Sequence, residues 1–159
     1  MKLSDALSRV DEYSKDLPSG CYLAHAFFMD DGRDEWQVGF VNPDDESIIV
    51  FVVSEDSVTK NPPSEAFKKP EDVIAPLRLE EVKVPASQAL AAAKKHLSEK
   101  YPTHPLKQAI LLLQVLDGSQ VYNITLVTET FYLLNLKLAS SSGEVVSEEF
   151  DHLMKLRQE

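Results

Sequence analysis

The chain has 159 residues, and its apolar (43%) and charged (26%) fractions are typical of a globular protein rather than a disordered or fibrous one. Lysines and arginines number 16 against 26 acidic residues, and the formal charge of -10 argues against binding to a nucleic acid phosphate backbone. The single cysteine, Cys21, excludes an intramolecular disulfide.

The first stretch, 1–56, is predicted to fold as a helix followed by three antiparallel strands. Apolar residues recur at steps of three and four between Leu3 and Leu17, which is the spacing of one helix face. Polar and apolar residues then alternate around Trp36, as on a strand with one buried face. The run 48–53 is apolar at every position, which predicts a strand covered on both faces. In chain order we expect the helix at 3–17 and the strands at 21–29, 35–40 and 48–53.

A proline-rich connection, 57–83, follows this stretch. Its prolines make most of it loop-like: Pro62, Pro63, Pro70 and Pro76. A connection of this length retains some local order in a compact protein. We therefore expect a short helix at 70–75 and an additional strand at 77–84.

The remaining stretch, 84–159, repeats the same order of elements and adds a helix at its end. Ala89, Ala93 and Leu97 mark one helix face, and Asp117-Gly118 indicates a tight turn between two strands. We expect the helix at 89–101 and the strands at 106–116, 121–128 and 131–138. The closing helix is predicted from four apolar residues: Phe150, Leu153, Met154 and Leu156.

An internal match indicates that the chain repeats itself. Residues 31–41 align with 117–127 without a gap; both begin with Asp-Gly and place an aromatic residue, Trp36 or Tyr122, at the same position. The sequence therefore predicts an α+β fold of two tandem helix-plus-antiparallel-meander (αβββ) units with a C-terminal helix. Because the apolar strands need cover on both faces, we expect the units to pack on each other, with a second chain as the alternative.

This order of elements resembles the PepSY and cystatin-like class of domains. The resemblance is carried by 87–93 at a helix start, 121–124 in the middle strand and 142–146 after the last strand. It covers about 84–146 and, in fewer positions, 4–56. It implies a non-catalytic binding or inhibitory function, and tandem domains are common in this class. Many members are secreted or membrane-attached, whereas this sequence shows neither a signal peptide nor an anchor, so we expect a cytoplasmic protein.

Residues capable of acid–base, nucleophilic or metal chemistry form no known motif. The four histidines show neither HxH nor HExxH spacing. Cys21 and His25 would lie about 13 Å apart in one extended strand, too far for a nucleophile and its base. The segment 30–35 starts no calcium loop, because the glycine and the final carboxylate are missing. We therefore expect no catalytic residue, no metal site and no cofactor.

Negative charge is concentrated in the first half of the chain. Residues 1–83 carry a net charge of -9, against -1 for residues 84–159. In a meander, the first turn and the end of the third strand lie at the same end of the sheet. This acidic sheet end is predicted to contain six carboxylates: Asp30, Asp31, Asp34, Glu35, Glu55 and Asp56. They form a solubility device at an edge, a weak divalent-ion site, or a binding surface for a protein partner with a basic surface.

Three functions are compatible with these observations. The leading hypothesis is a non-enzymatic binding or regulatory domain of PepSY-like character. The second is a small-ligand-binding or enzymatic domain with a cone-shaped cystatin-like cavity, for which His25 is the candidate residue. The third is an acidic chaperone or immunity-type partner of a basic protein. We expect no contact with nucleic acid or membrane, and a homodimer would supply the missing cover for the strands.

Overall fold

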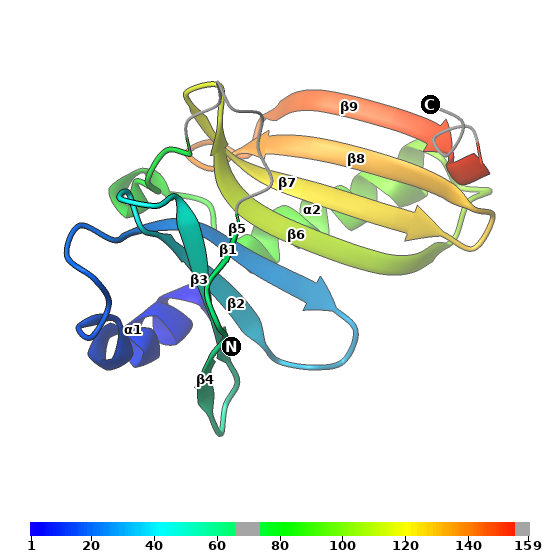
Figure 1. Ribbon diagram of the computed structural model, residues 1–159. Helices are drawn as coiled ribbons and strands as arrows, with labels where there is room; N and C mark the ends of the chain where they lie inside the picture. The colour runs from blue at the N-terminus through cyan, green and yellow to red at the C-terminus, as the bar shows by residue number, and fades with distance from the viewer. Residues whose placement is uncertain (66–73, 155–159) are drawn as a thin grey trace.

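The protein, seen in a computed structural model, is described over residues 1–65 and 74–154. Over these residues two α-helices and a nine-stranded antiparallel sheet form an α+β fold, which confirms the predicted class (Figure 1). A short 3-10 helix, η1, precedes the second α-helix. In chain order the elements are α1 Leu3–Ser14, β1 Tyr22–Asp30, β2 Trp36–Val41, β3 Ser47–Val53, β4 Val58–Lys60, β5 Ser64–Glu65, η1 Leu79–Glu81, α2 Ala86–Lys100, β6 Leu106–Leu116, β7 Ser119–Thr128, β8 Tyr132–Ala139 and β9 Val145–His152.

The two helix-plus-meander stretches share one sheet and meet edge to edge. The strand order is β4-β3-β2-β1-β6-β7-β8-β9, with β5 also paired to β3. At the junction, residues 26–30 of β1 pair antiparallel with residues 109–113 of β6. The expectation that the two stretches pack on each other face to face is therefore wrong. Hydrogen bonds between β1 and β6 satisfy two sheet edges that face-to-face stacking would leave open.

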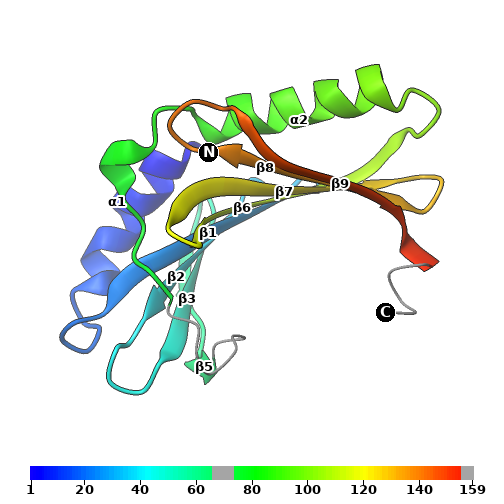
Figure 2. The ribbon, with the colours of Figure 1, turned by 90° about the horizontal axis from the view of Figure 1, so that it is seen from above.

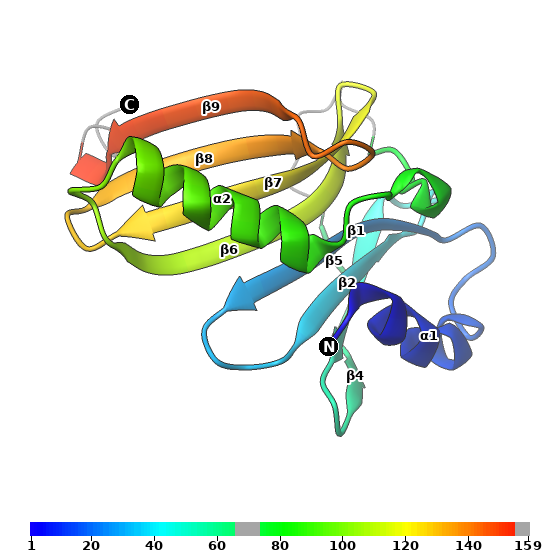
Figure 3. The ribbon, with the colours of Figure 1, turned by 180° about the vertical axis from the view of Figure 1, so that it is seen from behind.

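Both helices lie on the same side of the sheet (Figures 2 and 3). α1 contacts β2 and β3, whereas α2 contacts β6, β7 and β8. On α2 the predicted stripe is confirmed, because Ala89, Ala93 and Leu97 are buried in the core. The two alanines have short side chains, which lets α2 approach the sheet closely.

α1 is shorter than its sequence pattern predicts. It ends at Ser14, and Tyr13 is 48% exposed instead of continuing the buried stripe. The residues that do reach the core are Ala6 and Val10. A turn then leads to Gly20, whose positive φ of 89° redirects the chain into β1.

No helix among the described residues covers the opposite face of the sheet (Figure 2). Along β3 and β6, alternate residues such as Phe51 and Leu111 are buried under the helices, while Val52 and Leu112 are half-buried on the other face. No described helix therefore covers these strands on the second face, and the cover by a second chain that the sequence left open stays a prediction. Neighbouring aliphatic side chains shield one another across strands, so an apolar face need not have a complete layer over it.

The prediction of a C-terminal helix is wrong for the residues up to 154 that the structure describes. Phe150 lies in β9 and pairs with Leu134 of β8, and only Leu153 and Met154 have helical backbone. Leu156 lies outside the described residues. Hydrogen bonds to the open edge of β8 favour a strand here. The spacing of apolar residues in the sequence could not reveal that this edge is available.

Glu148 ties β9 to α2. Its carboxylate accepts hydrogen bonds from Lys100 Nζ at 2.6 Å and Tyr101 Oη at 2.8 Å, and lies 2.8 Å from His96 Nε2. The Lys100 ammonium, helped by Tyr101 and His96, lowers the pKa of Glu148 to about 2. One side chain of β9 thus bonds to two residues of α2 and to Tyr101, which directly follows the helix.

The connection contains different elements from those predicted. β4 and β5 lie in its first part, and residues 77–84 contain η1 rather than a strand, so that expectation is wrong. Lys83 and Val84 donate their N–H groups to the same carbonyl, that of Ser140, at 3.0 and 3.1 Å. Isolated backbone hydrogen bonds of this kind do not form the regular hydrogen-bond ladder that defines a strand. Of the helix predicted at 70–75, residues 70–73 lie outside the described residues.

Within residues 1–65 and 74–154, neither helix has the length and apolarity needed to cross a bilayer.

Candidate functional site

A cavity of about 800 Å³ lies where α1 and α2 begin. In Figure 2 the N-terminus of the chain lies beside the start of α2. It is lined by residues 1–4 and Leu7 around the start of α1, by Leu79, Val82 and residues 85–87 around the start of α2, and by the sheet residues Trp36 and Tyr122. Its apolar wall is formed by six side chains: Leu3, Leu7, Trp36, Leu79, Val82 and Tyr122.

Both helices begin at this cavity without a side-chain cap. α1 starts after Lys2 and α2 after Pro85, and neither of these residues supplies a side-chain acceptor to the first turn that follows. The first N–H groups of a helix have no acceptor within the helix. Ser4 and Ser87, one in each first turn, also line the cavity. The cavity therefore combines an apolar wall with polar groups at the two helix starts.

Trp36 and Tyr122 contribute aromatic surface to the wall. Trp36 is 3% exposed, and its indole Nε1 donates to the Met1 carbonyl at 3.0 Å. Tyr122 is fully buried and donates its hydroxyl to the Val84 carbonyl at 2.6 Å. Burial raises the pKa of Tyr122 to about 12, so the phenol stays neutral. Because both rings are buried and their polar atoms are bonded, they form the base behind the cavity, and the accessible apolar surface comes from Leu79 and the half-buried Leu3, Leu7 and Val82.

Leu79 is the exposed member of the wall, with 44% of its surface accessible to solvent. It is the first residue of η1. The residue before it, Arg78, is held by two hydrogen bonds between its backbone and the Gln120 side chain. Arg78 donates its N–H to Gln120 Oε1 at 2.7 Å, and Gln120 Nε2 donates to the Arg78 carbonyl at 3.0 Å. Gln120 is buried at the start of β7. An apolar side chain is therefore held in contact with solvent at the cavity.

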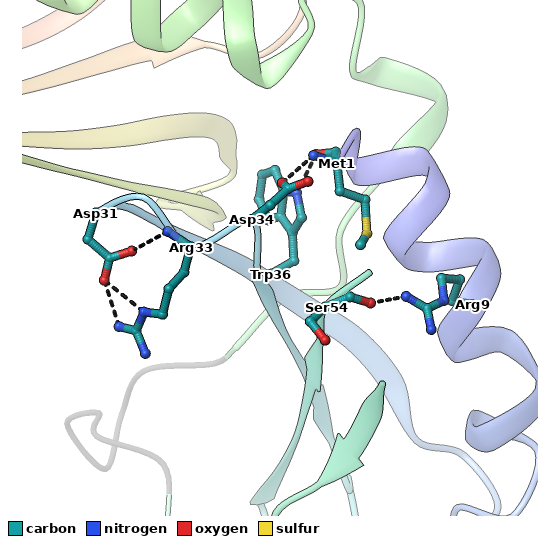
Figure 4. A network of polar contacts seen from close by, with 7 residues as sticks. All are labelled: Met1, Arg9, Asp31, Arg33, Asp34, Trp36 and Ser54. Carbon is teal, nitrogen blue, oxygen red and sulfur yellow. Dashed lines mark hydrogen bonds and ion pairs between the residues drawn. The ribbon is translucent and has the colours of Figure 1, made fainter. Parts of the chain in front are cut away.

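The cavity is linked to the acidic sheet end through the first residue of the chain (Figure 4). The Met1 amine forms an ion pair with Asp34, while the Met1 carbonyl accepts the Trp36 hydrogen bond. On the next turns of α1, Arg9 donates to the backbone carbonyl of Ser54. Two polar contacts thus hold α1 against the turns that carry the acidic residues.

The register brings the predicted acidic residues to one end of the sheet. Trp36 pairs with Phe28 on one side and with Val53 on the other, so the turns at 31–35 and 54–57 are neighbours. Several of the carboxylates already have cationic partners within the chain. Asp30 lies 2.5 Å from Lys94 Nζ, Asp31 lies 2.7 Å from Arg33 Nη2, and Asp34 pairs with the Met1 amine. The Arg33 hydrogen bonds lower the pKa of Asp31.

The other three acidic residues at this end are Glu35, Glu55 and Asp56. No described cation forms an ion pair with them. The charge available to a partner at this end is therefore smaller than the count of six carboxylates suggests.

The histidine singled out in the sequence does not line the cavity. The His25 ring lies against Gly39, where an added Cβ would approach its Cε1 to 2.0 Å, so this glycine is needed for the ring to fit. Burial lowers the pKa of His25, which favours the neutral imidazole. Burial, together with Asp45 and Asp44, raises the pKa of the Cys21 thiol. Among the described residues, no three His, Cys, Asp or Glu side chains gather as metal ligands do.

Sequence reasoning missed the cavity because its lining comes from distant segments. The available signal was the alignment of Trp36 with Tyr122: both matched aromatic residues line the same cavity. Leu79, in a stretch interpreted as a strand, gave no signal of its own.

Comparisons with known proteins add a likeness of fold. No family model and no curated protein matches the chain. A crystal structure of a protein described as a putative lipoprotein from Clostridium difficile 630 superposes with a TM-score of 0.66. The alignment covers 95% of this chain and 93% of that chain, at 16% sequence identity. At this identity the likeness concerns the fold alone.

Proposed function

We propose that this protein is a non-enzymatic binding module that holds a small, predominantly apolar molecule in the cavity between the starts of α1 and α2. The cavity itself carries the proposal. Its volume, about 800 Å³, lies within the range of small-molecule sites, which are concave, mostly apolar and furnished with a few polar groups. Leu79 and the half-buried Leu3, Leu7 and Val82 supply accessible apolar surface in front of the buried rings of Trp36 and Tyr122, and Ser4 and Ser87 supply polar groups.

The two stretches that meet at the cavity are, in this proposal, copies of one PepSY-like αβββ unit. Residues 31–41 and 117–127 both consist of a turn followed by a strand. Trp36 and Tyr122 are both buried among the residues under the helices and both line the cavity. A repeat of this kind places equivalent surfaces near each other, and the ligand would lie between them.

Binding is tested with N-phenyl-1-naphthylamine, an uncharged apolar probe. Trp36 is the single tryptophan of the chain, so its emission reports directly on this cavity. We expect saturable one-to-one binding that changes the Trp36 emission. Ser87→Phe, which places a ring at the cavity, should weaken binding about tenfold or more, since overfilled sites do not adapt freely. Ser98→Phe, on the exposed side of the same helix, is the matched control and should bind as the unmodified chain does.

A probe that does not bind, or that binds equally well to the Ser87→Phe variant, would show that the cavity is not the site. Circular dichroism of both variants checks that α2 is intact.

A partner with a basic surface is a second candidate, favoured by the gathering of acidic turns at one end of the sheet. In this reading the protein acts as a regulatory or chaperone-like partner, and a homodimer through the uncovered sheet face is the alternative assembly. The field of several carboxylates speeds encounter with a cationic surface, and salt screens it beyond roughly 8–10 Å. Three of the six carboxylates are paired within the chain, so Glu35, Glu55 and Asp56 would carry the interaction.

A further inference from the structure

We propose that the ligand of the cavity is an amphipathic acid, with an apolar body against Leu3, Leu7 and Leu79 and an anionic headgroup near Lys2. This inference rests on the proposed function and specifies the chemistry of the molecule bound. It is drawn from the charges and polar side chains that line the cavity.

The cavity wall has a charge opposite to that of the protein. The whole chain contains 26 acidic residues against 16 basic ones, yet the lining includes one basic side chain, Lys2, and no carboxylate. An anionic headgroup in contact with the lining would therefore meet the Lys2 charge and no carboxylate, although Asp5, Asp34 and Glu80 lie next to lining residues or are paired with them. A cationic headgroup would have no partner in the lining.

Lys2 has no ion-pair partner among the described residues, which distinguishes it from the lysines of α2. Lys94 pairs with Asp30, Lys95 with Glu99 and Lys100 with Glu148. Lys2 is an exposed residue just before α1 and is one of the residues that line the cavity. Its ammonium group is therefore available to an added anion without breaking an internal pair.

Two hydroxyl groups complement this charge. Ser4 and Ser87 line the same cavity, and each hydroxyl can donate a hydrogen bond to a carboxylate oxygen. Hydrogen bonds to an ionised acceptor are stronger than those between neutral groups. The first turn of α2, which holds no acidic residue, contributes a backbone dipole of the same sign, whereas Asp5 in the first turn of α1 offsets the dipole there.

The body of the ligand follows from the rest of the wall. Leu3, Leu7, Leu79 and Val82 offer accessible surface that cannot hydrogen-bond, so contact with them favours an apolar chain or ring. A molecule that satisfies both parts of the lining has one acidic group and an extended apolar body.

Three probes with one chain length and different headgroups test the inference: decanoate, decanol and decyltrimethylammonium. Their affinities are measured by Trp36 emission at low ionic strength. We expect decanoate to bind about tenfold more tightly than decanol, and decyltrimethylammonium more weakly than either. Lys2→Gln should weaken decanoate binding about fivefold to tenfold and leave decanol binding unchanged. Lys15→Gln, the same change at the exposed far end of α1, is the matched control and should affect neither.

The outcomes separate the two levels of the proposal. If decanol binds as tightly as decanoate, or if Lys2→Gln weakens the binding of both equally, the proposal of an acidic headgroup is wrong. The proposal of an apolar binding site is then unaffected. If Lys15→Gln lowers decanoate affinity as much as Lys2→Gln does, the preference reflects overall charge and the assignment to Lys2 is wrong. If neither decanol nor N-phenyl-1-naphthylamine binds, the proposed function itself fails.

Discussion

The two halves of the sheet differ in how firmly their helices are held. α2 spans 15 residues, buries Ala89, Ala93 and Leu97, and is bonded to β9 through Glu148. α1 spans 12 residues and buries Ala6 and Val10. The larger buried stripe makes α2 the more firmly packed helix, whereas α1 depends more on polar contacts, those of Met1 with Asp34 and Trp36 and of Arg9 with Ser54.

The largest loss of stability is expected for the buried side chain of Trp36 in the α1 half. Trp36→Ala removes a buried ring that packs on Phe28 at 5.1 Å and donates to Met1, and it should lower the free energy of unfolding by about 3–5 kcal/mol. Chemical denaturation measures the loss. Tyr13→Ala, at a 48% exposed position on α1, is the control and should change stability little. An unchanged midpoint for Trp36→Ala would contradict the buried position.

Tyr122→Phe tests the corresponding residue of the α2 half. It keeps the ring but removes the hydroxyl that bonds to the Val84 carbonyl at 2.6 Å. Because that carbonyl would lose its partner in a buried setting, we expect a loss of about 1–2 kcal/mol. Thermal or chemical unfolding measures it. A loss as large as that of Trp36→Ala would mean that the ring itself is displaced.

Because Glu148 bonds β9 to α2, the free energy of unfolding should depend on pH in the acidic range. The pKa of Glu148 is lowered from 4.5 to about 2 in the folded protein. Its stabilising contribution is therefore complete above pH 4.5, the value for the unfolded chain, and is lost as the pH falls toward 2.

Glu148→Gln should reduce stability at pH 7 by roughly 1–2 kcal/mol, because it weakens charge-assisted hydrogen bonds. It should also flatten the pH dependence between 4.5 and 2. Glu149→Gln, an exposed neighbour on the same strand, is the matched control. Equal pH profiles for Glu148→Gln and the unmodified protein would show that the tie does not stabilise the fold.

The smallest effect on stability is expected at the acidic sheet end. Exchanging Glu35, Glu55 and Asp56 for their amides should change the free energy of unfolding by less than about 0.5 kcal/mol, as surface substitutions do. If this end binds a basic partner, the triple variant should associate more slowly with a lysine-rich peptide at low salt and show a weaker salt dependence.

Neutralising Asp30, Asp31 and Asp34 instead should cost more stability, because each of them has an ion-pair partner. Equal association rates for the Glu35, Glu55 and Asp56 variant and the unmodified chain would reduce the acidic end to a solubility device.

Local patterns in the sequence were sufficient for most of the secondary structure. The stripe at Ala89, Ala93 and Leu97 repeats at helical spacing, and alternation around Trp36 is a property of neighbours in the chain, so both could be predicted. The buried position of Trp36 followed from the same alternation. The gathering of the acidic turns at one sheet end required only meander geometry.

What only the tertiary structure decided depends on contacts between distant segments. β9 is a strand because β8 offers an open edge, and that edge is not visible in the local spacing around Phe150. The pairing of β1 with β6 depends on which strand edges of the two stretches meet. The position of both helices on one face of the sheet follows from that pairing. The cavity exists because residues 1–7, 79–87, Trp36 and Tyr122 come together, and the ion pairs of Asp30 and Asp34 form across similar separations. Side-chain periodicity records whether a residue is buried, whereas the partner that buries it is set by the path of the whole chain.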